Sequence, residues 1–327
     1  MGRINLMKFK NFFIIFFISI NSYGDDLSIG FIEETYLKSG SNERRIQIYY
    51  PVKTDINSET KFIIMNDGEE LFFEKDSWNG QSWNIDDSFK DLKKEGRDLN
   101  VIVIAIDSAK RYRGNLIDET RRYAEYFPKE SIKYINENVK RSIYSNFIDT
   151  QKFDYQSFII KEVIPYIEKK FNLKLKKSNL GIIGASMGGL AALNIAIENP
   201  ETFGFVGSLS THWVGIKITE YLTLPFKMNM SGNQSTTEAL IYGDEATTGA
   251  IRSYVEDNIK VLLLDKLYFD HGTVGLDSLY KNPQENINKI LNNNDVKFKM
   301  EVHLDHDHEP KFFGERFKSI LEYLLYD

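Results

Sequence analysis

The residues best suited to chemistry in this chain are Ser186 and a group of histidines and acids nearer the C-terminus. Ser186 is the centre of a Gly-Ala-Ser-Met-Gly run at residues 184–188. An apolar, β-branched stretch at 180–183 precedes it, and an alanine-rich stretch with helical spacing follows, up to Ile197. This order predicts a buried strand, a tight turn and a helix. A serine in such a turn is held out at the end of the strand, where its hydroxyl can attack a carbonyl carbon.

A glycine-rich run also occurs in two settings without a nucleophile. A plain Gly-rich turn ends many ordinary strands, and a phosphate-binding loop also uses glycines. The run lacks the Gly-Lys-Ser/Thr ending and the G-x-G-x-x-G spacing of phosphate-binding loops. Gly184 and Gly188 also lack the Cβ atoms that would clash where a strand and a helix pack closely. The pattern therefore favours a serine nucleophile.

A serine that attacks a carbonyl needs two backbone N–H groups to stabilise the negative oxygen that forms. The N–H of Met187, at the start of the helix, is the first candidate. In enzymes with this turn the second donor comes from a loop after an early central strand. Residues 61–65 predict such a strand, and the polar turn after it contains Gly68 and Glu69. We expect the second donor near Gly68, with a simple Asp-Gly turn as the alternative.

A serine alone is a weak nucleophile, so it requires a base and a group that orients the base. The candidate bases are His306 and His308, in the loop before the last helix, because the acid and then the base follow the serine along the chain in such enzymes. His303 lies inside the last strand pattern and is expected to be structural. The other two histidines of the chain are His212 and His271.

The candidate acid is Asp277, in the loop after the strand that precedes the last one. Asp270 and Asp244 are its rivals, because position along the chain does not separate the three strongly. The loop at residues 305–309 could instead be a metal site, since two histidines and three acids occur there within five residues. Metal sites usually take further ligands from elsewhere in the chain, so we expect no metal and no other cofactor.

The remaining pattern predicts the elements that must position these groups. Strands alternate with helices, which indicates a mainly parallel sheet covered on both faces in one domain. Residues 214–258 show no steady period, so they could form a cap over the site or a long connection. The predicted strands are 29–37 and 44–50 as an antiparallel edge pair, then 61–65, 100–106, 180–183, 203–209, 266–269 and 296–304. Further helices are predicted at 153–171, 283–293 and 312–325.

The first 24 residues have the features of a secretion signal. Arg3, Lys8 and Lys10 precede an apolar run at 12–20, and small residues at 22–24 suit cleavage after position 24. A retained anchor is the alternative, but the run is only about half the roughly 20 residues that span a bilayer. We therefore expect a signal peptide at 1–24, one domain at 25–327, and a periplasmic or secreted protein without stable membrane insertion.

Composition excludes several other classes. The 327 residues are 42% hydrophobic and 27% charged, as in ordinary globular proteins, and they include no cysteine, which excludes disulfides and thiol chemistry. The formal net charge is -6, or about -9 without the three positive charges of the signal. Such a chain lacks the basic excess that binds nucleic acid, so a small-molecule partner is favoured.

Two features besides the candidate serine, base and acid could contact a substrate. Arg122 belongs to a charged segment with Arg111, Arg113, Arg121 and Glu125, and arginine holds carboxylates with two parallel hydrogen bonds. A solvated face with weak ion pairs is the alternative. Trp213, four residues after the end of the strand at 203–209, could provide an aromatic surface.

Together these motifs resemble the putative esterase family of α/β hydrolases, which includes siderophore (enterobactin-type) esterases, S-formylglutathione hydrolase and feruloyl esterases. The similarity covers nearly all of the chain after the signal. The matching segments are GASMGGL at 184–190, NPETFG at 199–204, NDGE at 66–69, RYAEYFP at 122–128, STHW at 210–213 and FDHGTVGLDSLY at 269–280.

The resemblance implies an α/β-hydrolase fold with an insertion or cap after the strand that follows the nucleophile helix. It also implies Ser186 as nucleophile, Asp277 as acid and a histidine of the last loop as base. In the family this histidine stands eight residues before an arginine of the closing helix, which favours His308 with Arg316. Family members usually have a glutamate two positions after this histidine. Here Glu309 directly follows His308, so His306 remains a candidate base.

The expected activity is hydrolysis of a carboxylic ester through an acyl-serine intermediate. Export and the arginine-rich segment suit a siderophore ester, whereas Trp213 would suit a carbohydrate-linked ester. Acyl transfer to an acceptor other than water is an alternative within the same chemistry. A binding protein that retains the fold without turnover is the alternative from another class.

Overall fold

The computed structural model describes residues 27–39, 42–53, 55–77, 79–109, 117–150, 153–215 and 243–326. The expected signal peptide at 1–24 lies outside the described residues, as do Arg111 and Arg113. Most of the expected cap also lies outside them, since residues 216–242 are not described.

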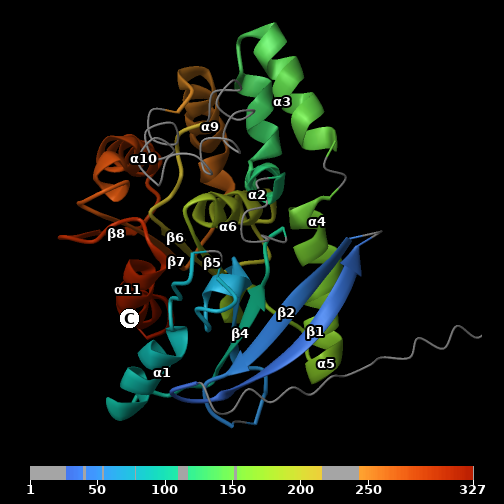
Figure 1. Cartoon of the computed structure of the whole chain (residues 1–327), viewed down its shortest axis with the longest axis vertical. Helices are drawn as coiled ribbons and strands as arrows, with labels where there is room; N and C mark the ends of the chain where they lie inside the picture. Colours follow the sequence, from blue (N-terminus) through green and yellow to red (C-terminus); the bar gives the residue numbers. More distant parts are fainter. Residues whose placement is uncertain are drawn as a thin grey trace, which may run out of the picture.

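The described strands form one sheet in the order β1-β2-β4-β3-β5-β6-β7-β8 (Figure 1). The first two strands are antiparallel at one edge, and β2 pairs with β4 antiparallel; every other pairing is parallel. The predicted mainly parallel sheet is therefore confirmed. The strands are β1 (Phe31–Ser39), β2 (Asn42–Tyr50), β3 (Lys61–Asn66), β4 (Val101–Ile106), β5 (Leu180–Ala185), β6 (Phe205–Leu209), β7 (Lys266–Gly272) and β8 (Lys299–His303).

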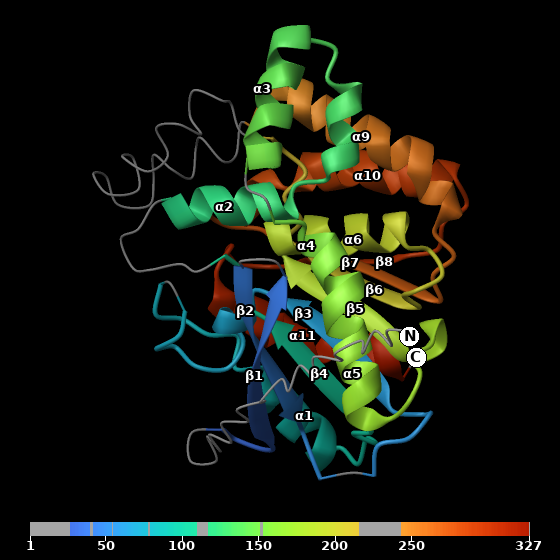
Figure 2. The same cartoon turned by 90° about the vertical axis from the view of Figure 1, so that its right-hand side faces the viewer.

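Helices cover both faces of this sheet, because the central strands are apolar on both sides. The side chains of β3, β4 and β5 are buried almost throughout, and they divide alternately between two hydrophobic clusters. One cluster includes α1 (Ile85–Lys94) and α11 (Pro310–Leu325). The other includes α2 (Ile117–Tyr126), α3 (Asn138–Thr150), α4 (Tyr155–Phe158), α5 (Ile164–Phe171), α6 (Met187–Glu198), α9 (Glu245–Asn258) and α10 (Lys281–Asn293). Figures 1 and 2 show the sheet between these two layers.

Several helical segments differ from the sequence prediction, which included neither α1 nor α3. The predicted helix at 153–171 is divided by a π-helical stretch, Ile159–Val163. The charged segment that contains Arg122 forms α2 from Ile117 onward, a helix that the pattern did not predict. In the stretch without a steady period, Asp244 caps the start of α9 by accepting from the Thr247 N–H at 3.0 Å. Such caps are local signals, but the irregular spacing before them concealed this one.

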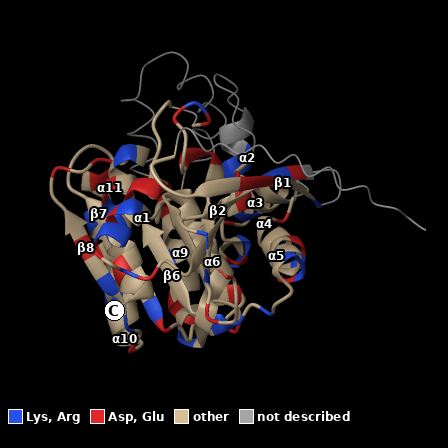
Figure 3. Cartoon of the chain, turned by 90° about the horizontal axis from the view of Figure 1, so that it is seen from below, with Lys and Arg blue, Asp and Glu red and all other residues tan. Residues whose placement is uncertain are grey.

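Charges of both signs are mixed over the surface. In the view of Figure 3, basic and acidic residues share α1, α5 and α11. On the described ranges, no helix combines the length and the apolar character that crossing a membrane requires.

Candidate active site

Ser186 stands in the turn between β5 and α6 with a backbone that only a few residue types tolerate. Its φ is 57° and its ψ is -124°, a region that is sparsely populated by residues with a side chain. Two backbone hydrogen bonds fix the turn: the Ser186 N–H donates to the Leu209 carbonyl at 2.9 Å, and the His212 N–H donates to the Ser186 carbonyl at 3.2 Å. The neighbouring strand β6 therefore holds the serine in this strained conformation.

The two glycines around the serine let the strand and the helix approach closely. A Cβ on Gly184 would lie 2.4 Å from the Gly188 carbonyl, and one on Gly188 would lie 2.6 Å from an Asp67 carboxylate oxygen. Asn66 adds a direct link, because its amide donates to the Gly188 carbonyl at 2.7 Å. The start of α6 is thus packed against the end of β3, where the second oxyanion donor was expected.

The acid and the base candidates lie in the loops after β7 and β8. Asp277 is fully buried, and its Oδ1 is 2.7 Å from Nδ1 of His308. Its Oδ2 accepts from the Ser210 hydroxyl at 2.7 Å, the Gly272 N–H at 2.7 Å and Arg316 Nη2 at 2.9 Å. One carboxylate oxygen is therefore saturated by three donors, which leaves the other for the imidazole.

Burial alone would raise the pKa of Asp277. The hydrogen bond and charge of His308, together with the charge of Arg316 and the Ser210 hydroxyl, outweigh burial and hold this pKa well below its usual range. The carboxylate therefore stays ionised at every pH at which the protein is expected to work.

Backbone hydrogen bonds join these two loops directly. The N–H groups of Thr273 and Val274 both donate to the His306 carbonyl, at 3.0 and 3.2 Å. The Leu276 N–H donates to the Asp307 carboxylate at 3.0 Å. Because β7 and β8 are parallel neighbours, their carboxyl ends meet at the same edge of the sheet, and these bonds set the separation of the loops.

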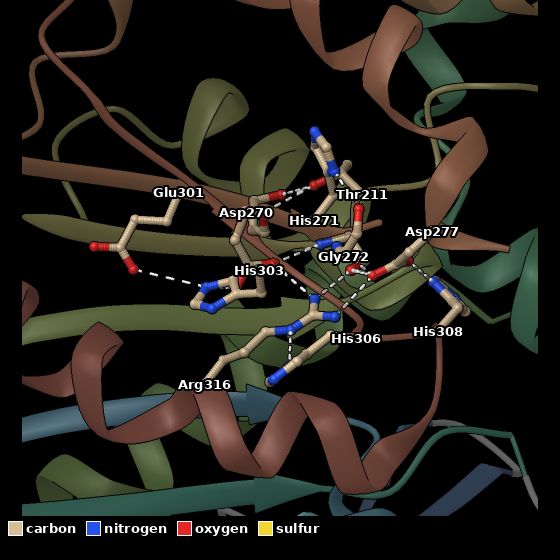
Figure 4. Close-up of polar contacts among 12 residues, drawn as sticks. Thr211, Asp270, His271, Gly272, Asp277, Glu301, His303, His306, His308 and Arg316 are labelled. Atoms are coloured by element: carbon tan, nitrogen blue, oxygen red, sulfur yellow. Dashed lines mark hydrogen bonds and ion pairs between the residues drawn. The ribbon is translucent and has the colours of Figure 1, made fainter. Parts of the chain in front are cut away.

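Arg316 of α11 ties the two buried acids of this region together (Figure 4). Besides Asp277, its guanidinium contacts the Ser210 hydroxyl at 2.8 Å and Asp270 Oδ1 at 3.3 Å. Burial raises the pKa of Asp270 to about 7, against the lowering effect of Arg316, and the charge of Asp277 raises it further. Asp270 therefore shares the arginine with the acid and does not reach an imidazole at hydrogen-bond distance.

The other candidate base has different partners. His306 accepts from Nε of Arg316 at 3.3 Å, its Nε2 is 3.5 Å from Glu315, and its ring packs on Phe312 with centroids 4.9 Å apart. The structure thus places His308, and not His306, on the carboxylate of Asp277.

The remaining rivals also have structural partners. His303 Nε2 lies 3.7 Å from Asp270, and His271 Nδ1 lies 2.6 Å from the Gly272 carbonyl. Asp244, which caps α9, also forms an ion pair with Lys140, whose Nζ is 2.8 Å from Oδ1 of the aspartate. Over the described ranges, no group of three or more His, Asp and Glu side chains is arranged to hold a metal ion.

Arg122 corrects one expectation about substrate contact. Its Nε and Nη2 donate to the two oxygens of Asp67, at 2.6 and 2.7 Å, so the two-pronged geometry is used inside the protein. Three residues further along α2, Glu125 pairs with Arg44 of β2. The R-x-x-E spacing therefore connects α2 through Arg122 to the loop after β3 and through Glu125 to β2. In that loop Gly68 begins a short 3₁₀ turn, Gly68–Glu70.

Trp213 corrects a second expectation. Its side chain is 2% exposed, its indole N–H donates to Gln284 at 2.8 Å, and its ring packs near Phe269. Trp213 belongs to the core under α10 and is not placed to contact a substrate.

Sequence reasoning missed two residues that the structure brings to the site. Tyr280 and His212 lie beside the Ser186 turn, and the Tyr280 hydroxyl is 2.9 Å from Nδ1 of His212. The STHW and FDHGTVGLDSLY segments contain both residues, but their spacing alone gives no role to either.

Comparison with known proteins gives one family match. The family model described as "Putative esterase" matches residues 38–239, which include the Ser186 turn.

Individual proteins resemble the chain in shorter segments or in fold. A curated endo-1,4-beta-xylanase/feruloyl esterase of Xylanibacter ruminicola is 40% identical over 57 residues, 17% of this chain and 8% of that protein. In the curated relatives that the chain matches, the aligned stretch is a quarter of the relative's length or less.

Two solved structures share the fold over most of this chain. An S-formylglutathione hydrolase from Agrobacterium tumefaciens has a TM-score of 0.56 at 14% identity, covering 93% of this chain and 97% of the other. The enterobactin esterase of Shigella flexneri has a TM-score of 0.54 at 15% identity, covering 89% of this chain and 59% of the other.

Proposed function

Because this chain belongs to the putative esterase family, we propose that it is a carboxylic ester hydrolase that works through an acyl-serine intermediate. Ser186 is the nucleophile, His308 is the general base and Asp277 orients the base. The observation that carries the proposal is the 2.7 Å contact between Asp277 and His308 at the sheet edge where the strained Ser186 turn ends β5.

The proposed reaction proceeds in two halves. Nε2 of His308 takes the Ser186 proton while Oγ bonds to the ester carbonyl carbon, and the same nitrogen then gives that proton to the departing alcohol. Water repeats the sequence on the acyl-serine and releases the carboxylic acid. Asp277 stays ionised and favours the positive imidazole, because its one free oxygen faces Nδ1.

The negative oxygen that forms in each half is assigned to two backbone donors. Met187 is the first residue of α6, so its N–H is one of those that a helix leaves without an internal partner. The second donor is a backbone N–H near Gly68, in the turn that Arg122 holds through Asp67. Losing one such donor costs roughly a hundredfold in rate or more.

For the substrate we propose a siderophore ester or a carbohydrate-linked ester, met outside the cytoplasm after removal of residues 1–24. The basic and apolar pattern of those residues supports export. The activities for which two similar proteins are named, feruloyl esterase and enterobactin esterase, support the two substrate classes.

The first test is hydrolysis by the mature protein of p-nitrophenyl acetate and butyrate, then of enterobactin and of a feruloylated arabinoxylan fragment. We expect both nitrophenyl esters to be cleaved and one natural ester to be preferred by at least tenfold in kcat/KM. An alcohol acceptor added to the assay checks for acyl transfer. A protein that cleaves none of these esters and does not react with a fluorophosphonate would leave the binding-protein alternative standing.

The pH dependence gives a second prediction. Activity is expected to fall on the acid side with a limiting slope of one, tenfold per pH unit, because a protonated His308 cannot accept the Ser186 proton. Asp277 is not protonated in this pH range, because its pKa is held well below the usual range. His212 is not protonated either, because burial lowers its pKa to about 3. The measurement is log kcat/KM between about pH 8 and pH 4.5 at constant ionic strength. Activity that stays constant down to about pH 4.5 would contradict a histidine base. A limiting slope of two would show that a second proton also stops the reaction, and Asp270, whose pKa burial raises to about 7, would be its candidate site.

A further inference from the structure

Tyr280 brings a phenol hydroxyl to the proposed nucleophile. Its backbone N–H donates to the Asp277 carbonyl at 3.1 Å, so it belongs to the same turn as the acid. Its ring packs on the His308 imidazole with centroids 5.3 Å apart. The hydroxyl is 2.9 Å from Nδ1 of His212. Burial raises the pKa of this phenol, while the nearby Ser186 side chain lowers it. The hydroxyl therefore lies beside a buried histidine and close to the reacting oxygen.

His212 is held in place by the nucleophile turn itself. Its backbone N–H donates to the Ser186 carbonyl at 3.2 Å, and its side chain is 2% exposed. Within the described residues, its Nε2 is buried with no hydrogen-bond partner. A buried polar atom left in this way costs about 1–3 kcal/mol, so packing alone gives no reason for a histidine here. Burial lowers the pKa of His212 to about 3, which keeps the ring neutral.

The number of protons determines which group donates to which. Burial raises the pKa of Tyr280 above its ordinary value, so its hydroxyl keeps its single proton. Once Ser186 has given its proton to His308, its Oγ can only accept. A hydrogen bond between the two oxygens then needs the phenol proton, and the phenol oxygen must accept from the Nδ1–H of His212.

We propose that Tyr280 is a further catalytic residue, which donates a hydrogen bond to Oγ of Ser186, and that His212 is a positioning residue, which holds the phenol through its Nδ1–H. This inference rests on the proposed function. In acylation the Oγ–carbon bond forms as the proton moves from Oγ to Nε2 of His308. In deacylation that bond breaks, and Oγ takes from Nε2 of His308 a proton that came from the attacking water. Tyr280 keeps its O–H bond throughout and stabilises the negative charge on Oγ in both halves.

The direct test is Tyr280→Phe, which removes only the hydroxyl. We expect kcat for p-nitrophenyl butyrate to fall about tenfold to a hundredfold with little change in KM, the scale of one hydrogen bond to a developing charge. The rate of fluorophosphonate labelling is expected to fall by a similar factor, because labelling uses the same oxygen. The matched control is Tyr254→Phe in α9, which loses a hydroxyl that binds Glu198 at 2.5 Å and is expected to label at the wild-type rate.

A second pair of variants tests the role of His212, and the comparison of these two variants with each other does not depend on how well Tyr280→Phe folds. In His212→Asn, the side-chain amide can donate in place of Nδ1–H, whereas His212→Phe offers no donor. We expect the asparagine variant to keep at least several times the kcat of the phenylalanine variant, and His212→Phe combined with Tyr280→Phe to be little slower than Tyr280→Phe alone.

The outcomes separate this inference from the proposed function. An active wild type with Tyr280→Phe as fast as Tyr254→Phe, in kcat and in labelling, would overturn the role of Tyr280 and leave the Ser186 mechanism intact. Equal activities of His212→Asn and His212→Phe would overturn the role of His212. A wild type that is inert toward every ester and toward the fluorophosphonate overturns the proposed function and this inference with it.

Discussion

Ser186→Ala is expected to remove ester hydrolysis almost completely, lowering kcat by about a millionfold, the scale seen when the serine of a catalytic triad is replaced. The substitution removes one oxygen atom and leaves the Cβ. The backbone at φ 57° and its hydrogen bonds to Leu209 and His212 therefore stay as they are. The thermal midpoint is expected to move little, so a loss of activity cannot be attributed to unfolding. The measurement is p-nitrophenyl butyrate hydrolysis beside fluorophosphonate labelling followed by mass spectrometry.

The matched control is Ser157→Ala in α4, a serine outside the proposed site that neighbours Asp154 and whose backbone N–H donates to that acid at 2.9 Å. This variant should hydrolyse and label like the wild type. If Ser186→Ala still hydrolyses the ester at a rate near that of the control, the acyl-serine mechanism fails, and another nucleophile or a water-based reaction must be sought.

The nucleophile turn could be predicted because its signal is local. The apolar run, the two glycines and the small residues of α6 are contiguous, and each limits the backbone within a few residues. The antiparallel edge pair and the central strands were predictable for the same reason, since alternation and apolar runs are properties of short segments. The chain order of acid and base then limited the candidates to two histidines and three aspartates.

The partners of these residues could not be predicted, because they depend on contacts between distant segments. The sequence favours a substrate contact for Arg122, but its fork meets Asp67, 55 positions earlier. Trp213 lies four residues after the end of β6, but its indole N–H donates to Gln284 of α10. In each case the polar group bonds to a residue that is distant in the sequence. The periodicity of the sequence does not reveal which residue that is.

The three hydrogen bonds to one oxygen of Asp277 show most clearly how the site depends on distant segments. Ser210 follows β6, Gly272 ends β7 and Arg316 lies in α11, so three elements meet on one oxygen atom. Their donors fix the rotation of the carboxylate and leave the other oxygen directed at an imidazole. The family spacing between histidine and arginine contains this information indirectly, because the arginine of the closing helix is the group that orients the acid.

His308→Ala is expected to lower kcat by at least about ten-thousandfold, because the variant keeps the nucleophile but has no group that accepts its proton. His306→Ala should retain activity within about tenfold, since His306 contacts Arg316 and Glu315 and not the acid. The two histidines are two positions apart in one loop, so each variant is the control for the other. The assay is kcat for p-nitrophenyl butyrate, with the thermal midpoint of each variant measured alongside.

The reverse order of activities would move the base to His306 and would require the loop at 305–309 to rearrange. The Thr273 and Val274 N–H groups that now bind the His306 carbonyl would then have to exchange partners. Equal, large losses in both variants would instead mean that the loop acts as a unit, and the base would have to be assigned from the pH profile of each. The 2.7 Å contact with Asp277 favours the first order, because an imidazole held through Nδ1 keeps Nε2 for the serine.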